Sequence, residues 1–373
     1  MLVLFMYLLK LMQSIPLKIK IPKSHLTRIL LPVLGLLMWL SAEAQVQELY
    51  LKGISNSNRG IYPEAIDVLQ EALSIDNNNP DCLLALAQVY RISGDLETAR
   101  KTLEKLKIYK PGMGSLELAR IYAYDGKTVE AIMYLREHLG SNYKIPSSEI
   151  LLDKAFASIE DTDEWRDLWS GDWYTEDEVL IQDILYQINS GEYMPALEKI
   201  DDELEVKGDW DALHAARGRV LLKMVQNQGA VQSYSSAIEL NSTNPGHYSG
   251  RAGAYIAQEK HKHAISDLEK AYRLEPENFE LLSQIGLQYQ VDGQYSKALE
   301  YLEDYLAFYP DNVETRYNIG LVYFETGSYL DALRYYNSCL QFETSDPKLL
   351  LPIVLFSIGL LSRNQMNRIF CSM

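Results

Sequence analysis

The chain has 373 residues, 47% of them hydrophobic, and its 51 acidic and 35 basic residues give a formal net charge of −16. The hydrophobic fraction is sufficient for a packed core and argues against a wholly disordered chain. A strongly acidic chain repels phosphate backbones, so we expect no nucleic-acid partner. The three cysteines are far apart in sequence, which disfavours a disulfide scaffold and a cysteine metal site.

Residues 18–44 have the three parts of a secretory signal peptide. Basic residues between Lys18 and Arg28 precede an apolar run from Ile29 to Leu40, and Ala42-Glu43-Ala44 supplies the small residues of a cleavage site. We therefore predict that residues 1–44 are a signal peptide cleaved after Ala44, or an uncleaved anchor, and that the protein is exported to the periplasm or cell envelope. Residues 1–12 are also apolar, which leaves open a start at Met12 or a longer anchor.

A 34-residue period follows the signal region. Residues 293–312 and 327–346 share Gly, Tyr, Ala and Leu in register. The repeats begin at Val46, Pro80 and Gly112 and then at Asp177, Asp211, Pro245, Phe279 and Val313. The predicted organisation is three repeats in residues 46–143, a degenerate Trp-rich repeat in residues 144–176 and five repeats in residues 177–346.

Small residues recur at two repeat positions, in seven of the eight repeats on an expected helix A and in all eight on an expected helix B. Their recurrence lets an antiparallel helix pair approach closely. Position eight of helix A holds Gly53, Ala87, Ala119, Gly218, Ala252, Gly286 and Gly320, and position twenty of helix B holds Ala65, Ala99, Ala131, Ala196, Ala230, Ala264, Ala298 and Ala332.

Turn and cap residues recur at the same period. Glycines suited to a left-handed turn lie between A and B, prolines follow helix B, and asparagines precede the next helix A as N-caps. These residues are Gly60, Gly94, Gly126, Gly191, Gly293 and Gly327, then Pro111, Pro276 and Pro310, then Asn79, Asn244, Asn278 and Asn312.

Together these anchors resemble the tetratricopeptide-repeat family, exported bacterial type, over residues 46–346. The resemblance implies an all-α fold, a right-handed α-solenoid of helix-turn-helix repeats, in which the A helices line a concave groove. Groove positions two, five, nine, twelve and thirteen are polar and aromatic, which suits a peptide or a helix of another protein, although an ordinary solvated surface is the alternative. They include Tyr50, Gln88, Arg91, Arg219, Lys223, Ser249, Ser283, Gln290, Tyr317, Phe324 and Glu325.

The lysines and asparagines of chaperone-binding members are missing from this groove. The corresponding positions hold residues such as Ser249, Gly253, Ser283 and Leu287. We therefore disfavour a receptor for chaperone tails.

Other candidate sites have simpler structural explanations. Trp165, Trp169 and Trp173 could form a docking patch, but we favour packing inside the degenerate repeat. His261 and His263 are two residues apart and point to different faces of a helix, so they disfavour a metal site. Cys339 is expected in the core.

We find no catalytic motif, so we expect a binding protein without enzymatic activity, cofactor or metal. The leading hypothesis is a protein-interaction scaffold or adaptor. The alternative is the N-terminal repeat part of a larger, truncated enzyme or regulator. The apolar tail, residues 347–373, fits a truncated chain or a helix covered by a partner or a membrane, and the apolar termini together leave membrane association open.

Overall fold

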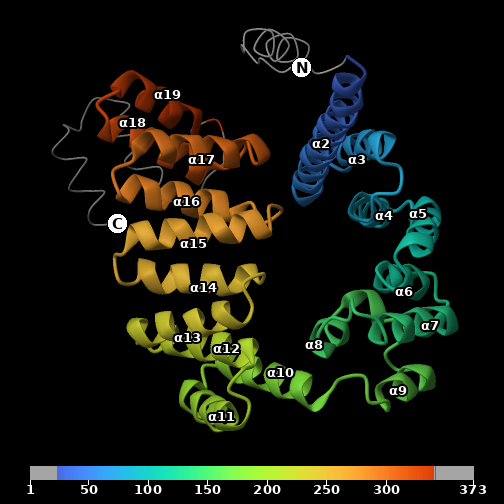
Figure 1. Ribbon diagram of the computed structural model, residues 1–373. Helices are drawn as coiled ribbons and strands as arrows, with labels where there is room; N and C mark the ends of the chain where they lie inside the picture. Colours follow the sequence, from blue (N-terminus) through green and yellow to red (C-terminus); the bar gives the residue numbers. More distant parts are fainter. Residues whose placement is uncertain (1–22, 340, 342–373) are drawn as a thin grey trace.

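The computed structural model describes residues 23–339 and 341, in which every regular element is a helix. The eighteen α-helices and one 3-10 turn of this part of the chain form a curved array of consecutive antiparallel pairs (Figure 1). This confirms the predicted all-α solenoid.

Eight regular pairs match the eight predicted repeats, A helix first. They are α2 (Lys23–Asn58) and α3 (Tyr62–Ile75); α4 (Pro80–Ser93) and α5 (Leu96–Tyr109); α6 (Ser115–Tyr124) and α7 (Thr128–Leu139); α10 (Glu176–Asn189) and α11 (Tyr193–Val206); α12 (Asp211–Lys223) and α13 (Asn227–Leu240); α14 (Pro245–Ile256) and α15 (His261–Leu274); α16 (Glu280–Val291) and α17 (Tyr295–Phe308); α18 (Val313–Glu325) and α19 (Tyr329–Cys339).

Close approach within each pair depends on the small residues. All eight alanines at position twenty are fully buried. A Cβ atom added at Gly286 would lie 2.7 Å from the Leu302 side chain, and one at Gly218 would lie 2.7 Å from the Tyr234 ring. The residue opposite position eight is therefore a large one at position twenty-four, a partner that we did not predict.

The turns between A and B helices confirm the predicted use of glycine. The six turn glycines have φ between +69° and +92°. In the two repeats that lack this glycine, Val225 and Glu259 occupy its place with φ of +60° and +58°. The backbone conformation of the turn is thus kept even where the residue does not favour it.

The asparagine caps are confirmed at three of four sites. Asn79, Asn244 and Asn312 each accept a hydrogen bond from a backbone N–H of the following helix. The prediction is wrong for Asn278, whose side chain donates to Glu275 and does not cap α16. Because Phe279 holds the N-cap position with helical φ and ψ, the amide of Asn278 lies one residue too early.

Residues 144–176 interrupt the regular pairs. They contain α8 (Ser147–Leu151), the 3-10 turn η1 (Lys154–Phe156) and α9 (Asp163–Trp169). Trp165 is buried against Phe156, and Trp169 and Trp173 pack on the same cluster, which confirms structural packing for the tryptophans. We call α2–α9 the amino-terminal arm and α10–α19 the carboxy-terminal arm.

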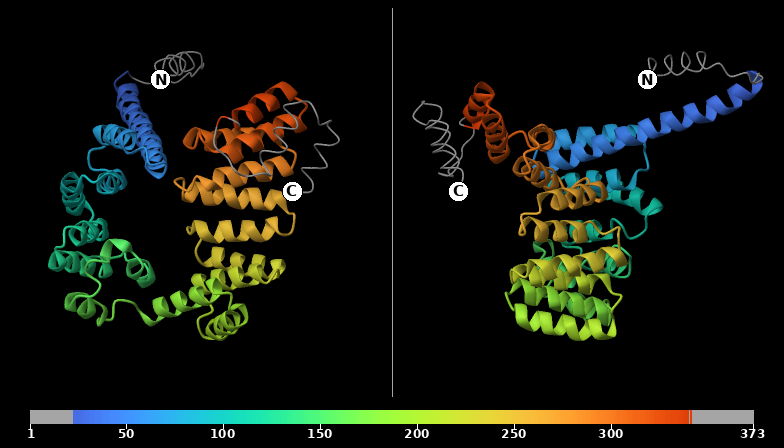
Figure 2. Two further views of the ribbon diagram at one scale, coloured as in Figure 1. Left: turned by 180° about the vertical axis from the view of Figure 1, so that it is seen from behind. Right: turned by 60° about the vertical axis from the view of Figure 1, so that its left-hand side comes forward.

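The two arms curve toward each other, and α2 meets α16 and α17, while α18 and α19 lie beyond this meeting point (Figures 1 and 2). Ser55 of α2 donates a hydrogen bond to the backbone carbonyl of Phe308, at the end of α17. We call this meeting of α2 with α16 and α17 the terminal contact.

Two predicted segments lie largely outside the described residues. Of the predicted signal peptide only the part from Lys23 is described, and it is continuous with α2, which protrudes from the array in Figure 2. The apolar tail, residues 347–373, is not described. None of the described helices combines the length and apolar character needed to cross a membrane.

Candidate functional site: the concave grooves

The A helices of the carboxy-terminal arm line a groove of about 630 Å³. We call it the basic groove, because its charged lining residues are Arg219 and Lys223 of α12 and no carboxylate lines it. The remaining lining residues are Ile181, Leu185, Ala212, Ala215, Ala216, Leu222, Tyr234, Asn244, Gly246, His247, Ser249, Gly250 and Gln284.

Both cations of the basic groove lie on one face of α12. Arg219 and Lys223 are four residues apart, so their side chains lie one turn from each other. Arg219 donates to the Asn189 side-chain oxygen at 2.9 Å, and no described carboxylate forms an ion pair with either cation. This groove is therefore a locally positive site on an acidic protein.

Small residues of α14 form one wall of the basic groove. Gly246, Ser249 and Gly250 leave the α14 backbone open to the groove. Tyr234 packs beneath Gly250, and burial raises the pKa of its hydroxyl to about 12. A peptide backbone could therefore approach this wall without meeting a large side chain.

A polar pair lies beside the basic groove: His247 is a buried lining residue, and Asp211 is half-buried and does not line the groove. The His247 Nε2 atom lies 2.9 Å from the Asp211 carboxylate, and Asn241 donates to the same carboxylate. Burial opposes ionisation of Asp211, but these hydrogen bonds from His247 and Asn241 hold its pKa below the usual value. The pair links two neighbouring repeats, and Arg219 and Lys223 are the exposed charges of the groove lining.

The amino-terminal arm has a second groove with paired charges, which we call the ionic groove. Glu117 is 4% exposed, and its two carboxylate oxygens accept from Arg91 and Arg120, each at 2.6 Å. Arg120 also donates to Asp153 at 2.7 Å. Because each arginine already has a carboxylate partner, this groove offers less positive charge to a ligand than the basic groove.

The structure divides the predicted groove residues among several environments. Arg219, Lys223 and Ser249 come together in the basic groove, and Gln88 and Arg91 line the ionic groove. On the carboxy-terminal arm, Gln290 donates to Glu325 at 3.2 Å, and Ser283 is half-buried on α16.

Three predicted aromatic residues are not on an open surface. Tyr317 and Phe324 are buried in a cluster with Tyr336 and Cys339, so the prediction that they line a groove is wrong for this conformation. Cys339 is a core residue, as predicted. Tyr50 is half-buried beside the terminal contact, where burial and then the Glu277 carboxylate raise the pKa of its hydroxyl. Helical position alone did not reveal this packing.

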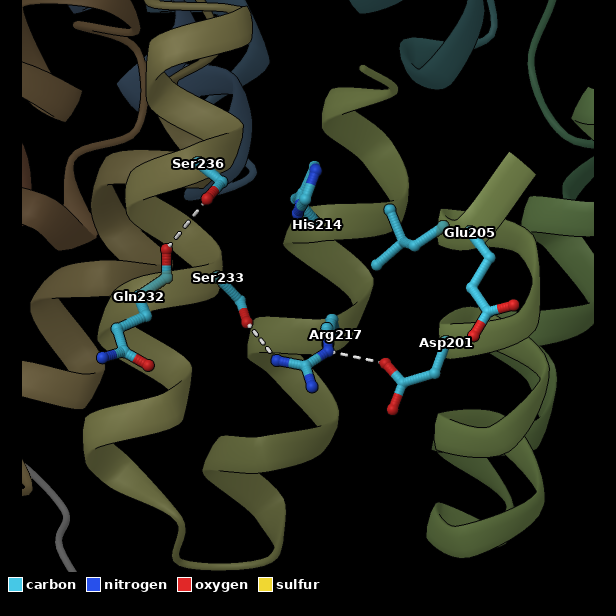
Figure 3. Close-up of a pocket in the computed structure, with 8 residues that line it drawn as sticks. Asp201, Glu205, His214, Arg217, Gln232, Ser233 and Ser236 are labelled. Atoms are coloured by element: carbon cyan, nitrogen blue, oxygen red, sulfur yellow. Dashed lines mark hydrogen bonds and ion pairs between the residues drawn. The ribbon is translucent and has the colours of Figure 1, made fainter. Parts of the chain in front are cut away.

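A third hollow, of about 430 Å³, lies among α11, α12 and α13 (Figure 3). At its centre Arg217 donates to Asp201 at 2.7 Å and to Ser233 at 3.2 Å. One repeat later, Arg251 makes the same kind of link to Asp267 and Ser235. These arginines join successive B helices, so we attribute this hollow to packing between repeats. The sequence signal for these links was the recurrence of arginine at Arg217 and Arg251, one 34-residue period apart.

Among the described residues, no group of three or more His, Cys, Asp or Glu side chains could hold a metal ion. His261 lies 2.9 Å from the Gln288 side chain, and His263 packs on Tyr255.

Three family models of the tetratricopeptide repeat match residues 59–113, 248–278 and 284–347. The matches cover α3 to α5, most of α14 and α15, and most of α16 through α19, and they confirm the repeat identification there. Among curated proteins, a DnaJ homolog subfamily C member 7 homolog of Schizosaccharomyces pombe is 25% identical over 64% of this chain and 47% of its own length. The TPR repeat-containing protein MJ1428 of Methanocaldococcus jannaschii is 26% identical over 52% of this chain and 32% of its own length. The chain thus spans less than half of either relative.

Solved structures give weaker similarity. MamA from Desulfovibrio magneticus is 15% identical with a TM-score of 0.42, covering 46% of this chain and 96% of that one. YrrB is 20% identical with a TM-score of 0.43, covering 46% of this chain and 88% of that one.

Proposed function

We propose that this protein, whose described helices carry tetratricopeptide repeats, is a protein-interaction scaffold and that it binds an extended, acidic segment of another protein in the basic groove. The proposal places the segment along α12 and α14, with a carboxylate between Arg219 and Lys223. An extended peptide suits the groove because the small residues of α14 leave its backbone accessible.

The charge of the basic groove is the observation that carries this proposal. Two cations face a groove without a lining carboxylate in a chain whose net charge is −16. Charge complementarity of this kind selects partners and raises their association rate. A guanidinium also binds a carboxylate through two parallel hydrogen bonds, which makes Arg219 the stronger anchor.

Binding of labelled twelve-residue peptides to the full chain tests the proposal. One peptide set contains Asp and Glu at alternate positions, and the matched set replaces them with Asn and Gln. We expect the acidic set to bind, and Arg219→Glu/Lys223→Glu to weaken this binding at least about tenfold, since each charge contact of this kind contributes on the order of 1 kcal/mol or more.

A charge-matched variant controls for the overall field of the protein. Lys101→Glu/Lys262→Glu changes the net charge equally, but both side chains are exposed on B helices. Affinity close to that of the unmodified chain is expected. Equal losses in the two variants, or equal binding of acidic and neutral peptides, would contradict a specific site in the basic groove.

We also propose that the protein is exported and that Ala44–Gln45 is the cleavage site. Leu40 is 47% exposed, Val46 is the first buried side chain in the part of α2 whose side chains are described, which begins at Leu40, and Gln45–Asn58 alone has the length of α4. N-terminal sequencing of the protein recovered from cells should read from Gln45. A terminus upstream of it, with the chain in the membrane fraction, would instead support an uncleaved anchor.

A further inference from the structure

The terminal contact joins residues about 250 positions apart in an array whose other packing is between neighbours. Ser55, Asn58 and Arg59 contact Phe308, Tyr309 and Asp311, respectively. Beside these polar contacts, Leu51 and Ile54 of α2 pack against a cluster that includes Phe279, Leu282 and Tyr305. The two arms therefore form a closed ring (Figures 1 and 2).

The polar part of the terminal contact lies at the end of α17, where Ser55 is buried and Asp311 is exposed. Ser55 donates to the Phe308 carbonyl at 2.6 Å, and this carbonyl is among those that a helix end leaves without an internal partner. Arg59 lies 2.7 Å from Asp311, whose side chain is 63% exposed. Exposed ion pairs contribute little stability, so the Arg59–Asp311 pair can break at low cost.

The opposite side of the ring is joined by an irregular segment. Residues 170–175 lie between α9 and α10 and contain no helix. Lys144 bonds to the Trp173 carbonyl and Glu178, and Tyr174 donates to the Ile145 carbonyl. The arms are therefore connected by a few side-chain bonds here, whereas helices pack along their lengths within each arm.

We propose that the terminal contact is a reversible latch: the ring opens there by rotation of the arms about residues 170–175. The contact has the features of a latch for three reasons. It is small, it combines polar with apolar contacts, and it lies across the ring from residues 170–175, where the arms are joined by a few side-chain bonds. Opening separates α2 from α17 and leaves the helix pairs of both arms intact. Both grooves then become accessible from the side as well as along the ring axis.

Distance measurements between spin labels on the full chain test the latch. The labels replace exposed residues, Lys52 on α2 and Ala307 on α17, as Lys52→Cys and Ala307→Cys. Cys371 is replaced by serine, while Cys82 and Cys339 are buried and stay unlabelled. We expect a main short distance in the otherwise unmodified chain, and a several-fold larger long-distance population in Arg59→Glu, whose new carboxylate faces Asp311.

A charge swap separates opening of the latch from loss of fold. Arg59→Glu/Asp311→Arg restores an ion pair of reversed polarity and should recover the short distance, with helicity unchanged in all variants. An unaltered short distance in Arg59→Glu would show a permanent interface and overturn the proposal. A long distance alone in the unmodified chain would also overturn it, because the ring would then be open throughout. Loss of helicity in Arg59→Glu would overturn it as well, because the contact would then be part of the folding core.

Discussion

At the scale of single residues, the turn after α12 keeps a left-handed backbone conformation that the side chain of Val225 disfavours. Val225 has a φ of +60°, is 77% exposed and replaces the glycine used in six other repeats. We expect Val225→Gly to raise the free energy of unfolding by about 1 kcal/mol, because a left-handed conformation is costly for a β-branched residue and natural for glycine. Thermal or urea unfolding measures the change.

The same substitution elsewhere controls this prediction. Val206 is also exposed, at the end of α11, where the backbone is helical. Val206→Gly should lower stability, since glycine weakens helical positions. A higher free energy of unfolding in both variants would mean that backbone strain at Val225 is not the cause of the stabilisation.

We expect His138 to make the amino-terminal arm sensitive to acid. Its buried Nε2 accepts a hydrogen bond from the backbone N–H of Ile145. Burial, with a smaller effect of the Arg120 charge, lowers the pKa of His138 to about 4. Because this pKa lies below the unfolded value of about 6.5, the stabilisation is complete above pH 6.5 and is lost as the pH falls toward 4. Stability should fall by about 2 kcal/mol between pH 7 and 5 through this residue.

A comparison of variants isolates the contribution of His138 from that of the carboxylates. Melting temperatures of the unmodified chain and of His138→Gln are measured between pH 7 and 5. The variant should show a shallower decline, while exposed His263→Gln should follow the unmodified chain. Parallel curves for all three would exclude His138 as the source.

At the scale of the helix pair, glycine is used where a methyl group has no room. A Cβ atom at Gly286 would lie 2.7 Å from Leu302 and 3.2 Å from the Ala298 carbonyl. At Gly253 the nearest atom would be at 3.5 Å, an ordinary contact. We expect Gly286→Ala to lose about 1–2 kcal/mol through overpacking and Gly253→Ala to be neutral or stabilising, as measured by urea unfolding.

The sequence predicts the helix pairs well because they depend on local residues. Turn glycines, Asn79 and the alanines at position twenty act within one repeat, so a 34-residue comparison finds them. The grooves are less predictable. A position that faces a groove in one repeat faces a buried cluster in another: at position five, Ser249 lines the basic groove, whereas Tyr317 is buried. The terminal contact was not predicted, because it depends on the summed curvature of all the repeats.

At the scale of the whole molecule, the repeats contact mainly their neighbours, so a local weakness should remain local. We expect Gly286→Ala to accelerate hydrogen exchange in α14–α18 and to leave α4–α7 unchanged, because residues 144–176 separate the two arms. Mass spectrometry of peptides resolves this pattern. Uniform acceleration along the chain would mean that both arms unfold as one unit.

The terminal contact also sets an order of events during synthesis. Helix pairs form from residues close in sequence, and such local contacts form quickly. Arg59 must wait until Asp311 has left the ribosome and the intervening repeats have reached their final curvature, so ring closure comes after folding of the amino-terminal arm. Until then Leu51 and Ile54 lack their α16 and α17 neighbours, and the nascent chain carries an apolar surface that another polypeptide or a chaperone could cover.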